Sequence, residues 1–150
     1  MKLQTLAAVF ATAAALTTAC GIDPNGIWKV QPVSAQITAD NSGSPWDLDN
    51  SAPDVFAALT CPGSPSTSTN TPSVESNSPT WTTGGCTAKA GDLLAQKFTV
   101  QLFDSDLVSN ETITGVLTPD SLTEAQFVAG SITFGASGGM TSLVIDLEEQ

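Results

Sequence analysis

The sequence predicts an all-β protein, an antiparallel β-sandwich, and three observations point to this fold class. Short apolar stretches alternate residue by residue with polar ones, which is the period-2 pattern of half-buried strands. Glycine and proline, with 12 and 9 copies, interrupt these stretches as they do in turns. Helical periodicity is almost absent. Several short strands joined by such turns are typical of two packed antiparallel sheets.

The expected elements follow one another along residues 28–147. The stretch 61–79 is rich in Ser, Thr, Pro and Asn and predicts a long flexible surface excursion. Ser121 with Glu124 three residues later predicts a single helical turn. The strongest strand pattern covers residues 93–103. The other predicted strands are 28–37, 55–60, a short piece beginning at 81, 113–117, 132–134 and 143–147.

The first nineteen residues have the features of a bacterial lipoprotein signal peptide. Lys2 precedes a continuous apolar run over 6–15, which is too short to span a membrane as a helix. Small residues then lead into Cys20, an arrangement that resembles a lipobox. We therefore expect residues 1–19 to be removed and Cys20 to be lipidated. The alternative is ordinary secretory cleavage after Ala19 or nearby, and both routes imply export.

The predicted organisation after the signal peptide is a short tether, residues 20–27, followed by one domain over 28–150. The tether contains Pro, Gly and Asn. The domain is long enough to bury a core of its own. The expected location is the bacterial cell envelope, periplasmic or surface-exposed, with membrane attachment through the lipid. Gly21 after the cysteine favours the outer membrane by the enterobacterial sorting rule.

The charge balance excludes several function classes. Fifteen acidic residues face four basic ones, for a formal net charge of −11, which excludes nucleic acid as a partner. Histidine is absent, so no Ser-His-Asp triad, Cys-His pair or His-ligated zinc is available. Paired carboxylates could in principle serve glycoside hydrolysis, but no deep-cleft signature accompanies them. We therefore predict that the protein is not an enzyme.

Two cysteines remain once Cys20 is assigned to a lipid. Cys61 and Cys86 then form an even pair in an oxidising compartment, which predicts a disulfide. A bridge between them would close a loop of roughly 25 residues and stabilise the fold by about 3 kcal/mol. Redox catalysis is disfavoured because the chain has no C-x-x-C motif.

A tight acidic loop follows the strongest predicted strand. Like charges packed this closely repel, so such a loop is stable only if it is solvated or if a cation gathers its oxygens. The alternative is that acidic turn residues end the strands and keep an exported protein soluble. The polar side chains of this loop are Asp104, Asp106, Ser109 and Glu111.

These features, taken in chain order, resemble a C2 domain. That family is an eight-stranded antiparallel β-sandwich that commonly binds calcium through aspartates on loops at one end. The resemblance extends over residues 28–147 and implies the same fold for this chain. The residues that carry it are Asp54 before the second predicted strand, Pro79-Thr80-Trp81 after the surface excursion, and the Asp104-Ser105-Asp106 pair with Ser109 after the strongest strand.

The resemblance implies a calcium site built from aspartates of two loops. Calcium takes six to eight oxygen ligands in flexible geometry, so carboxylates, backbone carbonyls and water can complete the shell. The implied ligands are Asp54, Asp104 and Asp106, with Asp47 or Asp49 from the first loop and Glu111 from the last.

The sequence departs from the family pattern at two positions. The first-loop aspartate of the family falls on Leu48, which Asp47 and Asp49 flank, and both remain candidates. The last loop aspartate falls on Thr112, one residue after Glu111. The number of bound ions therefore stays open.

The sequence thus predicts an exported, lipid-anchored, calcium-binding C2-like module that mediates binding at the envelope surface. Phospholipid headgroups, a glycan or another envelope protein are the partners that this function would suit. The alternative is a metal-free structural or adhesive lipoprotein that uses the same sandwich.

Overall fold

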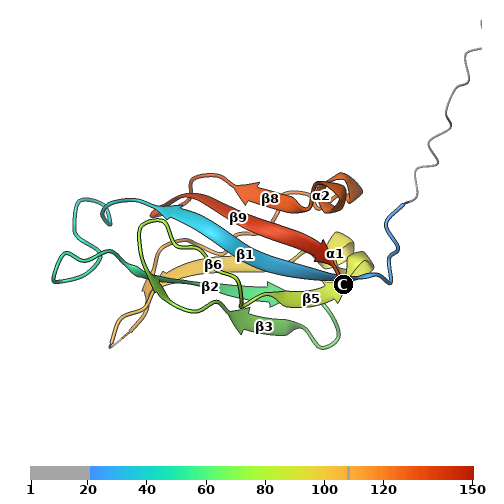
Figure 1. Cartoon of the computed structure of the whole chain (residues 1–150), viewed down its shortest axis with the longest axis horizontal. Helices are drawn as coiled ribbons and strands as arrows, with labels where there is room; N and C mark the ends of the chain where they lie inside the picture. Colours follow the sequence, from blue (N-terminus) through green and yellow to red (C-terminus); the bar gives the residue numbers. More distant parts are fainter. Residues whose placement is uncertain (1–20, 108) are drawn as a thin grey trace, which may run out of the picture.

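The computed structural model describes residues 21–107 and 109–150. They form two antiparallel sheets that pack face to face with the core between them (Figure 1). This confirms the predicted all-β antiparallel sandwich. The predicted signal peptide, residues 1–19, and the predicted lipidation site Cys20 lie outside the described residues.

The strand order defines the two layers. The first sheet has the order β5 (Cys86–Lys89), β1 (Ile27–Ile37), β9 (Met140–Glu149), β8 (Ser131–Phe134). The second has the order β3 (Thr67–Asn70), β2 (Asp54–Cys61), β6 (Thr99–Asp104), β7 (Glu111–Thr112), and β4 (Val74–Glu75) also pairs with β2. Since β3 and β4 pair with opposite ends of β2, they act as one interrupted strand. Counted in this way, the described residues fill eight strand positions.

Period-2 alternation builds the core of the second sheet. Every second residue of β2 is buried, and the same holds for β6. In β6 the inward positions are Val100, Leu102 and Asp104. A carboxylate therefore occupies a position that the strand pattern turns toward the interior.

Part of the prediction of a strand over residues 93–103 is wrong. Residues Ala90–Gln96 form helix α1, and β6 begins only at Thr99. Ala90 and Leu93 are three positions apart, so one helical turn buries both on the same face. Lys97, with φ 62°, ends the helix and donates its N–H to the Leu93 carbonyl. A short apolar stretch fits both periods, and its contacts with the core decide between them.

The prediction of a flexible excursion over residues 61–79 is also wrong, because this stretch supplies β3 and β4. Thr71 lies between them, is buried, and accepts the Ala57 N–H at its Oγ1 atom at 2.9 Å. Strands at a sheet edge expose most of their side chains, so a polar sequence here does not prevent pairing.

The predicted helical turn is present but begins later. Helix α2 spans Glu124–Ala129, and its capping box joins Thr123 to Gln126 rather than Ser121 to Glu124. Gly130, in the left-handed conformation at φ 72°, ends the helix and leads into β8.

The predicted disulfide is confirmed. Cys61 at the end of β2 and Cys86 at the start of β5 are bonded, with their Cα atoms 5.9 Å apart. Because β2 and β5 belong to different sheets, the bond ties the two layers together.

The acidic loops and the chain ends lie at opposite ends of the sandwich (Figure 1). The loops that follow β1 and β6 lie at one end, and the start of the described chain and the C-terminus lie at the other. Within residues 21–107 and 109–150, no helix is long and apolar enough to cross a membrane.

Candidate metal centre

A buried tryptophan holds the first acidic loop, which joins β1 to β2. The Trp46 indole N–H donates to the Thr38 carbonyl at 2.9 Å, and its ring lies so close to Gly139 that an added Cβ would be 2.5 Å from it. The Thr38 N–H in turn donates to the Gly139 carbonyl at 2.8 Å. Asp47 directly follows this anchored ring, so its backbone position is fixed by the core rather than by the loop.

Asp104 is the most unusual carboxylate of the described chain. It is the last residue of β6 and is fully buried. Its Oδ1 atom accepts the Asp54 N–H at 2.7 Å. Its Oδ2 atom is buried with no hydrogen-bond partner among the described residues. An unpartnered buried carboxylate oxygen is costly, so Asp104 is a candidate position for a ligand.

The structure brings three carboxylates together at this end. Asp47, Asp104 and Asp106 each offer an oxygen, and these oxygens all lie within 4.8 Å of one another. Asp47 comes from the loop after β1, and the other two come from the end of β6 and the loop that follows it. Elements far apart in sequence thus converge on one point.

The electrostatics of the cluster follow from burial and crowding. Burial raises the pKa of Asp104 to about 6 from the ordinary value of 3.8. The hydrogen bond from the Asp54 N–H acts in the opposite direction, while the charges of Asp47, Asp106 and Asp54 raise this pKa further. The site therefore carries an excess of negative charge that no basic group of the described chain offsets.

The other predicted ligands lie around these three without joining them. Asp49 is fully exposed and accepts the Ser51 N–H at 3.0 Å, which lowers its pKa. The Glu111 carboxylate accepts a hydrogen bond from the Asn41 side-chain amide. Asp54, Asp49 and Glu111 all line the groove that contains the cluster. Between the two first-loop candidates, the geometry favours Asp47.

The groove itself has a volume of about 800 Å³ and opens between the loops. Two features of it escaped the sequence reasoning. Glu75 in β4 lines it, because that strand pairs with the Asp54 end of β2. Leu48 and Leu107 also line it and are fully exposed, one on each acidic loop. The sequence did carry a signal for these two leucines, because each directly follows an aspartate of the cluster, Asp47 or Asp106.

The residues present fit calcium. The candidate donors are all oxygens, as a hard cation requires, and two of the three carboxylates remain accessible. Asp104, whose Oδ2 atom has no partner among the described residues, is the buried member of the cluster. Asp47, Asp104 and Asp106 would hold the ion, and Asp54 would support the site through its N–H bond to Asp104.

Structural comparison shows that the sandwich has a fold similar to that of C2 domains. The chain is similar to a structure of extended synaptotagmin 2 that holds two C2 domains, with TM-score 0.58 and 14% identity over 97% of this chain and 48% of that one. The calcium-bound structure of the same two domains gives TM-score 0.58 and 17% identity over 85% and 46%. A single-domain "Structure of a C2 domain" gives TM-score 0.52 and 12% identity over 83% and 98%.

These likenesses establish a C2-like fold. The chain spans about half the length of the two-domain structures that it matches. Neither a protein-family model nor a curated protein sequence matches the chain.

Proposed function

We propose that this chain is an exported, lipid-anchored attachment module of the bacterial cell envelope that binds calcium and, through it, phospholipid headgroups. Its C2-like fold typically serves binding rather than catalysis. The observation that carries the proposal is the buried, unpartnered Oδ2 atom of Asp104 beside the carboxylates of Asp47 and Asp106.

A divalent cation would resolve two conflicts at once. Three carboxylates whose oxygens lie within 4.8 Å repel one another, and burial weakens the screening by water. A cation would offset that repulsion and give the Asp104 Oδ2 atom a partner. Coordination positions that the protein leaves open would then accept oxygens of an anionic partner, such as phosphate groups.

Two leucines support a lipid surface as the partner. Leu48 and Leu107 are fully exposed on the same two loops that carry the cluster. In water each exposes a large apolar side chain, and burial of a leucine contributes about 1.5–3 kcal/mol. A lipid surface offers both the anionic headgroups and the apolar layer that such a pair requires.

The position of the tether bears on which surface is bound. The described chain begins at the end of the sandwich opposite the acidic loops (Figure 1). A lipid on Cys20 would therefore leave the acidic end directed away from the anchoring membrane. The proposed contact is with a second surface.

A calcium titration read by thermal unfolding tests the metal site. Calcium at ten times its dissociation constant should stabilise the fold by about 1.4 kcal/mol. The double substitution Asp104→Asn with Asp106→Asn should abolish this gain, while the matched control Asp49→Asn should keep it. Magnesium should act weakly, since it demands tighter octahedral geometry. An unmoved melting temperature in millimolar calcium would show that the metal proposal is wrong.

Vesicle sedimentation tests the partner separately. Vesicles with phosphatidylglycerol should bind the protein in calcium, and vesicles of phosphatidylcholine alone should bind it poorly. The double substitution Leu48→Ser with Leu107→Ser should weaken vesicle binding yet keep the calcium-induced thermal shift. If this variant binds the vesicles as well as the unmodified protein does, the two leucines do not contribute to lipid binding.

The anchor needs a test of its own. Mass spectrometry of the protein from its native membrane should find a diacylglyceryl group on Cys20. A different N-terminus, together with protein in the soluble fraction, would contradict lipidation.

A metal-free structural or adhesive module is the second candidate. Some of the carboxylates already have protein partners, since Asn41 donates to Glu111 and the Ser51 hydroxyl donates to Asp47 at 3.2 Å. This candidate becomes the better account if calcium changes neither stability nor binding.

A further inference from the structure

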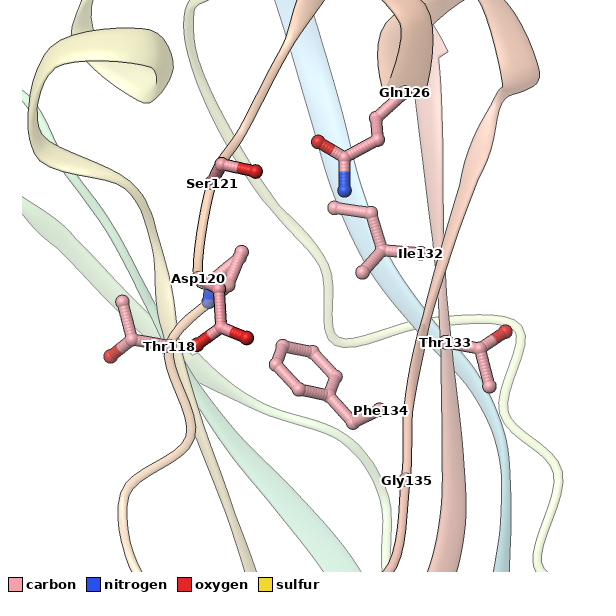
Figure 2. Close-up of a pocket in the computed structure, with 9 residues that line it drawn as sticks. Thr118, Asp120, Ser121, Gln126, Ile132, Thr133, Phe134 and Gly135 are labelled. Atoms are coloured by element: carbon pink, nitrogen blue, oxygen red, sulfur yellow. The ribbon is translucent and has the colours of Figure 1, made fainter.

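A second groove lies between strand β8 and the segment 118–121. It has a volume of about 350 Å³. In Figure 2, Ile132 and Phe134 point from β8 across the gap toward Asp120 and Ser121, and the Gln126 amide enters from helix α2. The calcium proposal uses none of these residues.

The register of the first sheet fixes which main-chain groups of β8 are free. The Leu147 N–H donates to the Gly130 carbonyl at 2.8 Å, so this opposed pair is a hydrogen-bonded one. In an antiparallel ladder such pairs alternate. Ile132, opposite Ile145, and Phe134, opposite Leu143, are therefore bonded to β9 as well.

The intervening residues of β8 point the other way. The N–H and C=O groups of Ser131 and Thr133 are directed away from β9. Within the part of the chain that the structure describes, β8 pairs with no strand except β9, and no other backbone bond to these two residues is present. Their main-chain donors and acceptors form an open strand edge.

This edge is protected against pairing mainly by its shortness, since β8 has four residues. The other protections that proteins place on such edges are lysine, proline, bulges or a covering element. The sequence of β8 is Ser-Ile-Thr-Phe, and its register with β9 is regular. The opposite edge strand of the same sheet, β5, ends at Lys89 and runs directly into helix α1.

The charge of the groove indicates what would fit it. Asp120 contributes a carboxylate, and no basic side chain lines the groove. Lys97 donates to the main-chain oxygen of Asp120, not to its carboxylate. Phe134 is half-buried beside Asp120 in Figure 2, so a long cationic side chain could lie along the ring and reach the carboxylate.

We propose that the free edge of β8 binds an extended peptide segment of a partner protein, which adds as a further strand and directs a lysine or arginine toward Asp120. Main-chain hydrogen bonds to Ser131 and Thr133 would supply the affinity, and the groove would supply the preference for a basic side chain. The inference is independent of the calcium site.

Hydrogen exchange in the presence of a probe peptide tests this, with calcium chelated throughout. The probe is a blocked hexapeptide of alternating lysine and valine, and the control carries N-methyl groups on the amides of one edge. With the probe, the Thr133 amide should exchange at least tenfold more slowly. The amides of Ile132 and Phe134 should change little, because they already bond to β9.

Two variants sharpen the test. Thr133→Pro removes an outward N–H at an edge position, where proline is tolerated, and should abolish probe binding. Thr133→Val keeps the N–H and should bind normally, while Asp120→Asn should weaken binding roughly threefold. If Thr133→Pro does not fold, the N-methylated control decides alone.

Three outcomes would overturn the proposal. Equal binding of the N-methylated peptide would reduce the interaction to general attraction by an acidic protein. Protection at Ile132 and Phe134 but not at Thr133 would contradict the derived edge. Protection of Thr133 that rises with protein concentration without any peptide would make a second copy of this chain the occupant.

Discussion

The two ends of strand β2 are built on opposite principles. At one end Cys61 is buried and covalently joined to the other sheet. At the other end Asp54 begins the strand, and its N–H supports the buried carboxylate of Asp104. One end stabilises the fold through a covalent bond, and the other concentrates negative charge that opposes folding.

This difference separates the scaffold from the candidate site within eight residues of sequence. The disulfide holds the two layers together regardless of what happens in the loops. A stable frame of this kind tolerates a strained cluster at its far end. The acidic end should therefore respond to pH and cations, while the cysteine end should respond to neither.

The largest expected effect comes from the cysteine end. Replacing both Cys61 and Cys86 with Ala should cost about 3 kcal/mol and lower the melting temperature by roughly 10 °C. The physical reason is the release of a loop with a sequence separation of 25. Thermal unfolding measures it, and the variant should retain its response to calcium. An unchanged melting temperature would contradict the structural role of the bond.

Asp104→Asn should produce the next largest effect, and in the opposite direction. Without metal at pH 7.5 the substitution removes a buried charge, so it should raise the free energy of unfolding by on the order of 1–3 kcal/mol. Denaturant unfolding in a chelator measures it, with Asp49→Asn as the matched exposed control. A loss of stability would mean that the contacts of the ionised carboxylate outweigh the cost of its burial.

The pH dependence of the metal-free protein should report the same group. The folded-state pKa of Asp104, about 6, is higher than the 3.8 of an ordinary aspartate. The folded protein therefore binds this proton more tightly than the unfolded chain. The stabilisation that this proton provides is fully present below about pH 4 and is lost as the pH rises to about 6. Above that pH, the contribution of Asp104 to the free energy of unfolding no longer changes.

The pH profile can be separated from that of the other carboxylates by comparison with Asp104→Asn. The difference in unfolding free energy between the two proteins should grow between about pH 4 and about pH 6 and then level off. A difference that does not vary over this range would contradict the raised pKa.

Calcium binding should show the reverse dependence. The ion requires the ionised carboxylate, so its affinity should fall by up to tenfold for each pH unit below about 6. Calorimetric titration between pH 5 and pH 7.5 measures this. An affinity that is constant across the range would place the ion away from Asp104.

The smallest effect is expected for Asp49→Asn. This side chain is fully exposed and bonds only within its own loop, to Ser51, so its loss should leave metal-free stability nearly unchanged. Calcium affinity should change by no more than a few-fold. A loss as large as that of Asp47→Asn would restore Asp49 as the first-loop ligand.

Much of the fold could be predicted because its signals are local. The period-2 patterns of β1 and β2, the closing hairpin of β8 and β9, and the cysteine pair are all legible in the printed sequence. The largest errors fell on α1 and on the 61–79 stretch, and the strand predicted over 113–117 is also absent, since β7 covers only Glu111–Thr112. In the first two cases short segments took their structure from the contacts that surround them.

The candidate site divides in the same way. The sequence alone determined that the chain is acidic, lacks histidine, forms a sandwich, and carries aspartates in the loops after two strands. Those facts depend on composition and on patterns within a few residues. They identify Asp104 as a candidate ligand, but they do not show that its side chain is buried.

Only the tertiary structure decided how these aspartates meet. It brings Asp47 rather than Asp49 to Asp104 and Asp106, because Trp46 anchors the loop against Gly139. It also leaves the Asp104 Oδ2 atom buried without a partner and opens the outer edge of β8. Each of these depends on contacts between segments distant in sequence, and burial and register exist only once the two sheets have packed.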